Sequence, residues 1–139
     1  MKFRDGMRWS FQERHIFGKQ KEQELLPTLR AVFGENLQPH PSQTSRYDFQ
    51  VEGGNRTVEL KSRTTSMGKY STTLLRANKI RNTTDDQYFC FNFPDGIVYI
   101  KYDQDIFRTY GTRYAEKYNE GLHYEIPVKS LIPIERVKN

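Results

Sequence analysis

The sequence predicts a mixed α/β (α+β) fold in which a central mixed β-sheet is flanked by helices. Segments 18–33 and 103–118 place apolar residues at the spacing of amphipathic helices, and 74–80 is predicted as a shorter helix. Short segments rich in aromatic and β-branched residues lie between them, and two pairs of these segments enclose a glycine-containing turn, as in a β-hairpin. With 139 residues the chain can bury one core, so we expect a single domain over residues 1–139.

The apolar side of the helix predicted at 18–33 begins with an acid. Glu22 precedes three leucines of this side by three, four and seven residues, which places it on the same side of the helix. These leucines are Leu25, Leu26 and Leu29. An acid at the edge of a buried stripe needs a partner, although a favourable interaction with the helix dipole is an alternative explanation for Glu22. Residues 8–16 are expected to form an arm before this helix.

The first predicted hairpin carries two acids and a lysine. Its strands are 47–51 and 57–61, separated by a turn that contains two glycines. Because side chains alternate along a strand, Glu59 and Lys61 point to one face while the apolar residues beside them point to the core. Antiparallel pairing across the turn brings Asp48, eleven residues before Glu59, toward the same place.

These residue types suit metal-assisted phosphoryl chemistry. Carboxylate oxygens are hard ligands that fit Mg²⁺ or Mn²⁺, and a magnesium site usually takes one or two of them. The metal activates the attacking water, and Lys61 would hold that water or stabilise the developing negative charge. The alternative is a solvated hairpin with a cross-strand ion pair, which contributes about 0–1 kcal/mol at a surface.

The hairpin resembles the active-site signature of the PD-(D/E)XK nuclease superfamily. Asp48 matches the first acid, and Glu59-Leu60-Lys61 matches the E-x-K element. Tyr47 replaces the proline that often precedes the first acid, a position that contributes backbone shape rather than chemistry. The resemblance covers residues 18–93.

The order of the elements resembles one group within this superfamily, the small archaeal-type Holliday junction resolvases. In that group a glutamate of the first helix completes the metal site, and Glu22 is the matching position. The resemblance implies a restriction-endonuclease-like core. It also implies that Glu22, Asp48 and Glu59 hold Mg²⁺ (or Mn²⁺) and that Lys61 assists the nucleophile, so that all four are catalytic candidates.

A one-sided basic segment follows the hairpin. Residues 61–81 contain six lysines and arginines, seven serines and threonines, and no acid. Such side chains contact phosphate oxygens and position a duplex without distinguishing its sequence. The candidates for DNA binding are Arg63, Lys69, Tyr70, Arg76, Lys79 and Arg81. A solvated loop and helix is the alternative interpretation.

The remaining segments are interpreted as scaffold. Strands 88–93 and 97–102 enclose the turn 94–96 as a second hairpin. Asp103 is a candidate N-cap for helix 103–118, whose inner side would carry five residues. These are Ile106, Phe107, Tyr110, Tyr114 and Tyr118. A last strand at 124–128 precedes a predicted closing turn at 130–133.

Composition agrees with a nucleic-acid partner and excludes several other classes. The net charge of +5 suits a polyanion. The single cysteine, Cys90, rules out an internal disulfide and a cysteine-based zinc site, which favours an intracellular setting. No apolar run reaches membrane-spanning length, so no membrane association is expected. The three histidines lack a metal-ligand spacing, and motifs of serine hydrolases, phosphate-binding loops and zinc proteases are missing.

We therefore expect a divalent-metal-dependent DNA endonuclease. The small size and the match in the first helix favour a structure-selective enzyme such as a junction resolvase. A resolvase makes two symmetric cuts, which favours a homodimer. The alternatives are a sequence-specific restriction-type or phage-type DNA nuclease, an RNA-directed nuclease, and a nucleic-acid-binding module without catalysis.

Overall fold

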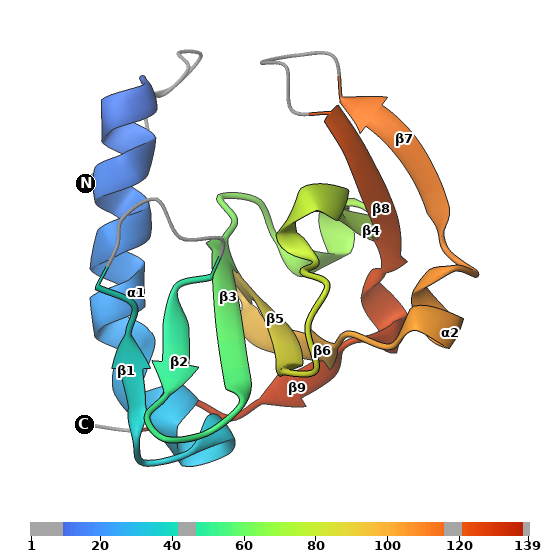
Figure 1. Ribbon diagram of the computed structural model, residues 1–139. Helices are drawn as coiled ribbons and strands as arrows, with labels where there is room; N and C mark the ends of the chain where they lie inside the picture. The colour runs from blue at the N-terminus through green and yellow to red at the C-terminus, as the bar shows by residue number, and fades with distance from the viewer. Residues whose placement is uncertain (1–9, 42–46, 116–120, 138–139) are drawn as a thin grey trace.

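The chain folds into a mixed sheet that lies between one long helix and a second, smaller sheet (Figure 1). This arrangement is seen in a computed structural model that describes residues 10–41, 47–115 and 121–137. The α+β class and the central mixed sheet are confirmed. A second sheet, rather than further long helices, covers the face opposite the helix.

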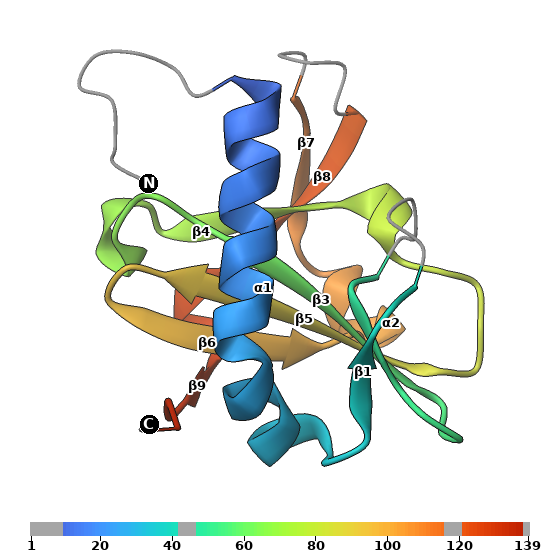
Figure 2. The ribbon, with the colours of Figure 1, turned by 90° about the vertical axis from the view of Figure 1, so that its left-hand side faces the viewer.

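The long helix α1 spans Phe11–Phe33 and begins seven residues earlier than predicted. Ser10 accepts a hydrogen bond from the backbone N–H of Glu13, and the Glu13 side chain accepts one from the Ser10 N–H, both at 3.1 Å. This capping box starts the helix within the segment predicted as an arm. The helix then crosses one face of the main sheet (Figure 2).

The main sheet has six strands in the order β1-β2-β3-β5-β6-β9. The strands are β1 (Leu37–Pro39), β2 (Phe49–Val51), β3 (Arg56–Ser62), β5 (Asp86–Phe93), β6 (Gly96–Lys101) and β9 (Ile132–Ile134). Strands β3 and β5 are parallel, and the other neighbouring pairs are antiparallel. Both predicted hairpins, β2-β3 and β5-β6, are confirmed.

The smaller sheet has the order β4-β8-β7 and consists of β4 (Thr72–Arg76), β7 (Gly111–Ala115) and β8 (Gly121–Pro127). The prediction of a helix at 74–80 was wrong. Thr73 and Leu75 are buried and alternate with more exposed neighbours, which is the burial period of a strand. Only the short 3-10 turn η2 (Ala77–Lys79) follows it. A similar turn, η1 (Met67–Lys69), precedes β4.

The prediction of a helix over 103–118 was also wrong in its length. Asp103 is the N-cap, as predicted, and accepts hydrogen bonds from two backbone N–H groups, but α2 spans only Gln104–Phe107. Thr109, Gly111 and Thr112 are weak helix formers, and the chain continues as strand β7. Tyr118 lies outside the described residues. The predicted closing turn at 130–133 contains the end of the 3-10 turn η4 (Val128–Ser130) and the start of strand β9.

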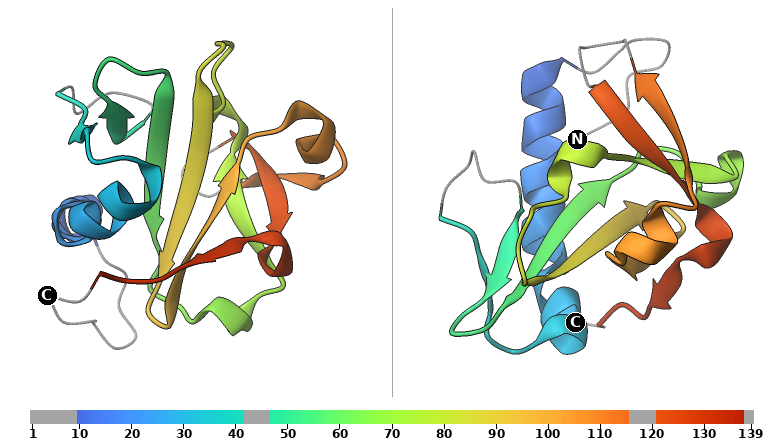
Figure 3. Two further views of the ribbon diagram at one scale, coloured as in Figure 1. Left: turned by 90° about the horizontal axis from the view of Figure 1, so that it is seen from below. Right: turned by 45° about the vertical axis from the view of Figure 1, so that its right-hand side comes forward.

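Two apolar clusters lie on opposite faces of the main sheet. One joins α1 to the sheet and includes Leu25, Leu29 and Val58. The other lies on the opposite face, where the smaller sheet and α2 pack (Figure 3). It includes Phe91, Phe107 and Ile126. Within the described ranges, no helix is both long and apolar enough to cross a membrane.

Candidate active site

Asp48 lies immediately before β2 and is fixed against the neighbouring strand β3. Its Oδ2 atom accepts a hydrogen bond of 2.8 Å from the backbone N–H of Leu60. Its own N–H donates to the carbonyl oxygen of Val58 at 3.0 Å, and its carbonyl accepts from the His40 N–H at 2.7 Å. The predicted pairing across the hairpin is therefore present, because Phe49 is opposite Val58 and the Asp48 carboxylate reaches β3.

Glu59 is held in a largely buried position on β3, where its side chain is 12% exposed. The two residues that flank it, Val58 and Leu60, belong to the cluster packed against α1. One carboxylate oxygen, Oε1, lies 3.1 Å from the Nζ atom of Lys79 on η2. The other, Oε2, is buried and has no hydrogen-bond partner among the residues that the structure describes.

This environment raises the pKa of Glu59 to about 8. Burial is the main cause, and the negative charge of Asp48 is the second. Lys79 and Lys61 act in the opposite direction and lower the pKa. Lys61 itself is an exposed residue of β3, two positions after Glu59 and on the same face.

Glu22 approaches the same aspartate from α1. Its side chain is 19% exposed and lies 3.2 Å from Nζ of Lys19. Burial, the charge of Asp48 and a side-chain hydrogen bond with Asp48 raise the pKa of Glu22 to about 7, against the effect of Lys19. When protonated, Glu22 can donate that hydrogen bond to the ionised Asp48. Glu24, by contrast, pairs with Lys21 and its side chain is 60% exposed, as expected for surface.

The fold thus brings Asp48 close to both Glu22 and Glu59. The three carboxyl groups come from helix α1, from the residue just before β2 and from the middle of β3. Burial and then the charge of Asp48 raise the pKa of both glutamates, and the nearby lysines offset only part of this rise. Such perturbed carboxyl groups are more frequent at functional sites than elsewhere.

The carboxyl groups fit a hard divalent cation, provided that only one or two of them bind it at the same time. In residues 10–41, 47–115 and 121–137, no group of three or more histidine, cysteine or acidic side chains is already arranged to hold a metal ion. A magnesium site needs only one or two protein carboxylates, the rest being water and substrate phosphate. The buried, unpartnered Oε2 of Glu59 and the close approach of Glu22 to Asp48 meet that smaller requirement.

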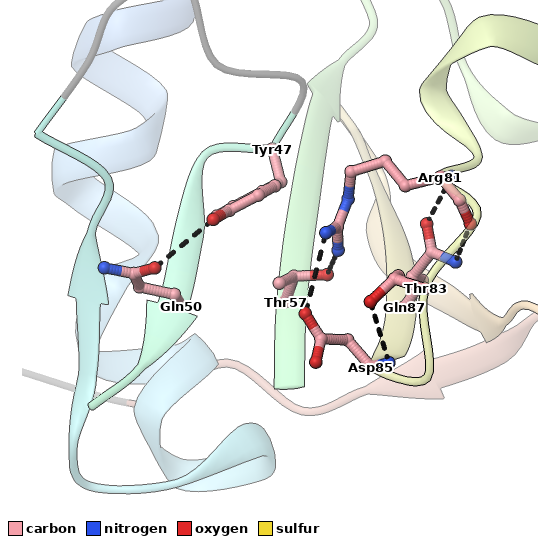
Figure 4. Close-up of polar contacts among 7 residues, drawn as sticks. All are labelled: Tyr47, Gln50, Thr57, Arg81, Thr83, Asp85 and Gln87. Carbon is pink, nitrogen blue, oxygen red and sulfur yellow. Dashed lines mark hydrogen bonds and ion pairs between the residues drawn. The ribbon is translucent and has the colours of Figure 1, made fainter. Parts of the chain in front are cut away.

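Arg81, predicted to contact DNA, has several partners within the protein (Figure 4). Its guanidinium donates to Oγ1 of Thr57 at 2.7 Å and lies 3.6 Å from the Asp85 carboxylate. The same group lies over the ring of Tyr47, 4.5 Å from its centroid. The Gln87 side chain bonds both the N–H and the carbonyl of Arg81. These contacts favour a structural role in joining the segment before β5 to β3.

The other predicted DNA contacts divide into internal and surface residues. Arg63 donates to the Leu74 carbonyl at 2.5 Å, Lys79 pairs with Glu59, and Arg76 is half-buried. Lys69 and Tyr70 are exposed, with the lysine 5.6 Å from the centre of the tyrosine ring.

Sequence reasoning did not connect Lys79 with Glu59. No local pattern marks a contact between residues 20 positions apart on different elements. It also did not connect Lys19 with Glu22, although lysine and glutamate three residues apart on a helix are a recognisable signal.

Comparisons with protein-family models, with curated proteins and with solved structures found no match to this chain. The function is therefore inferred from the site and from the sequence pattern.

Proposed function

We propose that this protein is a divalent-metal-dependent DNA endonuclease with a restriction-endonuclease-like core. Asp48, with Glu22 and Glu59, would hold Mg²⁺ or Mn²⁺, and Lys61 would assist the attacking water. The observation that carries the proposal is the position of Asp48, whose charge raises the pKa of glutamates on two other elements.

A purely structural role explains this arrangement poorly. Burying a carboxylate is costly unless its oxygens are paired, and removing one partner of a buried pair leaves an uncompensated charge. Asp48 is bonded to a backbone N–H and Glu59 to one lysine, yet Oε2 of Glu59 has no partner in the described part of the chain. A cation that replaced the proton of Glu59 would supply the partner that this oxygen lacks.

The residues divide the chemistry between them. A bound divalent cation lowers the pKa of water and neutralises negative charge that develops on the phosphate. Asp48, held by the Leu60 N–H, is the ligand whose orientation is fixed by the backbone. Glu22, whose pKa is about 7 in the metal-free protein, would release its proton on binding the cation. Lys61 is exposed beside Glu59, where it can bond water or a substrate oxygen.

The order of these residues also supports the proposal. A glutamate on the first helix, an aspartate at the next hairpin and E-x-K on its second strand resemble the small archaeal-type Holliday junction resolvases of the PD-(D/E)XK superfamily. This resemblance favours a structure-selective enzyme. It also favours a homodimer, because two symmetric cuts require two active sites.

Cleavage of labelled DNA tests the proposal. A four-way junction, the matching linear duplex, the single strand and an RNA duplex would be incubated with Mg²⁺, Mn²⁺ or a chelator. We expect metal-dependent DNA cleavage by the wild type, loss of cleavage in Glu59→Ala, and full activity in the control Glu24→Ala, which changes an exposed glutamate of α1. Paired cuts confined to the junction would identify a resolvase, and RNA cleavage would redirect the proposal to RNA. No cleavage with either metal would contradict catalysis.

One observation favours a second candidate, a nucleic-acid-binding module without catalysis. The 3.1 Å ion pair between Lys79 and Glu59 occupies one carboxylate oxygen without any metal. In such a module Asp48→Ala and Glu59→Ala would leave affinity for DNA unchanged or raise it, since each removes a negative charge near phosphate. The cleavage assay separates the two candidates.

A further inference from the structure

A cavity of about 400 Å³ lies beside the proposed active site. Most of its lining comes from the loop after β3 and from β4, with single residues from β5, β7 and η4. It includes Arg63, Arg113 and several hydroxyl groups. The three carboxyl groups of the proposed site do not line it. Arg63 follows Lys61 by two residues of extended chain, about 7 Å, so the two sites are neighbours.

The loop that forms one wall is fixed by hydrogen bonds at three places. The Arg63 guanidinium donates to the Leu74 carbonyl at 2.5 Å. The Met67 N–H donates to Oδ1 of Asp95 at 2.9 Å, and the Val128 N–H donates to the Ser71 carbonyl at 3.0 Å. A wall held in place before binding loses little conformational freedom when a ligand enters.

The charges of the lining select an anion. Arg63 and Arg113 come from different elements, and none of the described residues that line the cavity is acidic. Guanidinium groups bind phosphate through two parallel hydrogen bonds, and Arg113 is exposed on β7. The hydroxyls of Thr65, Ser66 and Thr72 add donors for phosphate oxygens.

The size of the cavity and its aromatic residue further limit which kind of anion it can bind. The volume falls in the range of small-ligand sites and is far too small for a duplex. Tyr70 belongs to the lining and is 62% exposed, so its ring is accessible to a planar group. Met67 and Phe93 contribute apolar surface. Phosphate donors beside an accessible aromatic ring are the combination that binds an unpaired nucleotide.

We propose that this cavity binds one unpaired nucleotide of the DNA substrate. Its phosphate would contact Arg113 and the hydroxyls of the lining, and its base would stack on Tyr70. The inference rests on the proposed function for the identity of the nucleic acid and extends it to the substrate class: duplex DNA with an adjoining unpaired strand, as at a branch, flap or frayed end.

Binding without cleavage tests this inference. Fluorescence anisotropy in a chelator would compare a labelled duplex with the same duplex carrying a short single-stranded extension. We expect the extension to tighten binding by about tenfold or more in the wild type, since stacking on an aromatic ring contributes that much per base. Arg113→Ala and Tyr70→Ala should remove this preference.

Two control variants match the test variants in chemistry. Arg108→Ala removes an exposed arginine that pairs with Asp105. Tyr114→Ala removes a tyrosine that is 72% exposed and adjoins Arg113. Neither residue belongs to the lining, so both variants should keep the preference.

Equal binding of the two duplexes by the wild type, or a preference that survives in both pocket variants, would overturn the inference. Its failure is distinguishable from that of the proposed function because the assay needs no metal. A preference without cleavage would support the cavity and contradict the nuclease. Cleavage without a preference for the single-stranded extension would support the nuclease and contradict the cavity as a nucleotide site.

Discussion

Replacing Glu59 by glutamine should change how the stability of the metal-free protein depends on pH. In the folded protein the pKa of this carboxyl group is raised from 4.5 to about 8, mainly by burial and then by Asp48. The folded state therefore holds the proton more tightly than the unfolded state. Below the unfolded pKa this contribution is fully present, and it is lost as pH rises toward the folded pKa.

The size of the effect follows from the difference between the two pKa values. Each pH unit between them changes the free energy of unfolding by about 1.4 kcal/mol per group. Between pH 5 and pH 8 the wild type should therefore lose about 3 kcal/mol through Glu59. Glu59→Gln should not lose this stability, because its amide stays neutral at every pH. In the variant Lys79, whose side chain is 27% exposed, can pair with water. The variant should be the more stable protein at pH 8 and nearly equal to the wild type at pH 5.

Urea denaturation in a chelator at pH 5, 6.5 and 8 measures this difference. Glu24→Gln is the matched control, because it makes the same chemical change at an exposed position of α1. Its stability should run parallel to that of the wild type. Glu22 contributes the same downward trend to all three proteins and cancels from the comparison. If the free energy of unfolding changed with pH in the same way for the wild type and Glu59→Gln, Glu59 would not be a buried, protonated group.

Three further predictions follow from individual contacts. Lys61→Met should reduce metal-dependent DNA cleavage about 100-fold or more while leaving Mn²⁺ binding measurable, and unchanged cleavage would exclude a catalytic role for this lysine. Lys79→Met should tighten Mn²⁺ binding about tenfold in calorimetry, because it removes a cation 3.1 Å from Glu59, and weaker binding would show that the lysine helps to form the site. Phe107→Ala should lower the free energy of unfolding, measured in urea, by about 3–5 kcal/mol. The reason is that Phe107 is 1% exposed and packs against Tyr102 and Tyr124. A loss below about 1 kcal/mol would contradict its place in the core.

The hairpin with its acids could be predicted from sequence because its signals are local. Two glycines define the turn, and alternation along β3 separates Glu59 and Lys61 from Val58 and Leu60. Glu22 could be placed near this hairpin only because its helix had to cover the same core. The apolar stripe of α1 packs on Val58 and Leu60, which carries Glu22 toward Asp48.

The two mispredicted helices show where local patterns fail. Segment 72–76 pairs with β8, so its backbone hydrogen bonds and its burial are decided by a strand 45 or more residues away. Asp103 begins a helix as predicted, but the aromatic spacing that suggested four turns does not continue it. Tyr114, assigned to the inner side of that helix, is 72% exposed on β7. Pairing with distant strands outweighs propensity in both segments.

The partners of the basic residues were beyond prediction for a similar reason. A run of lysines and arginines predicts a phosphate-binding surface when each side chain is assumed to be solvated. Here Arg63, Lys79 and Arg81 contact a carbonyl, a buried carboxylate and a threonine on other elements. Arg113 joins Arg63 at the cavity although 50 residues separate them in the chain.

Mn²⁺ binding tests most directly whether Asp48 organises a cation site. Calorimetric titration near neutral pH would compare the wild type with Asp48→Asn, in which an amide oxygen can still accept the Leu60 hydrogen bond. We predict saturable binding by the wild type, accompanied by proton release because Glu22 and Glu59 are partly protonated. Asp48→Asn should bind more than about tenfold more weakly, since even the loss of an outer-shell partner costs that much. No binding by the wild type, or equal binding by the two proteins, would contradict the site.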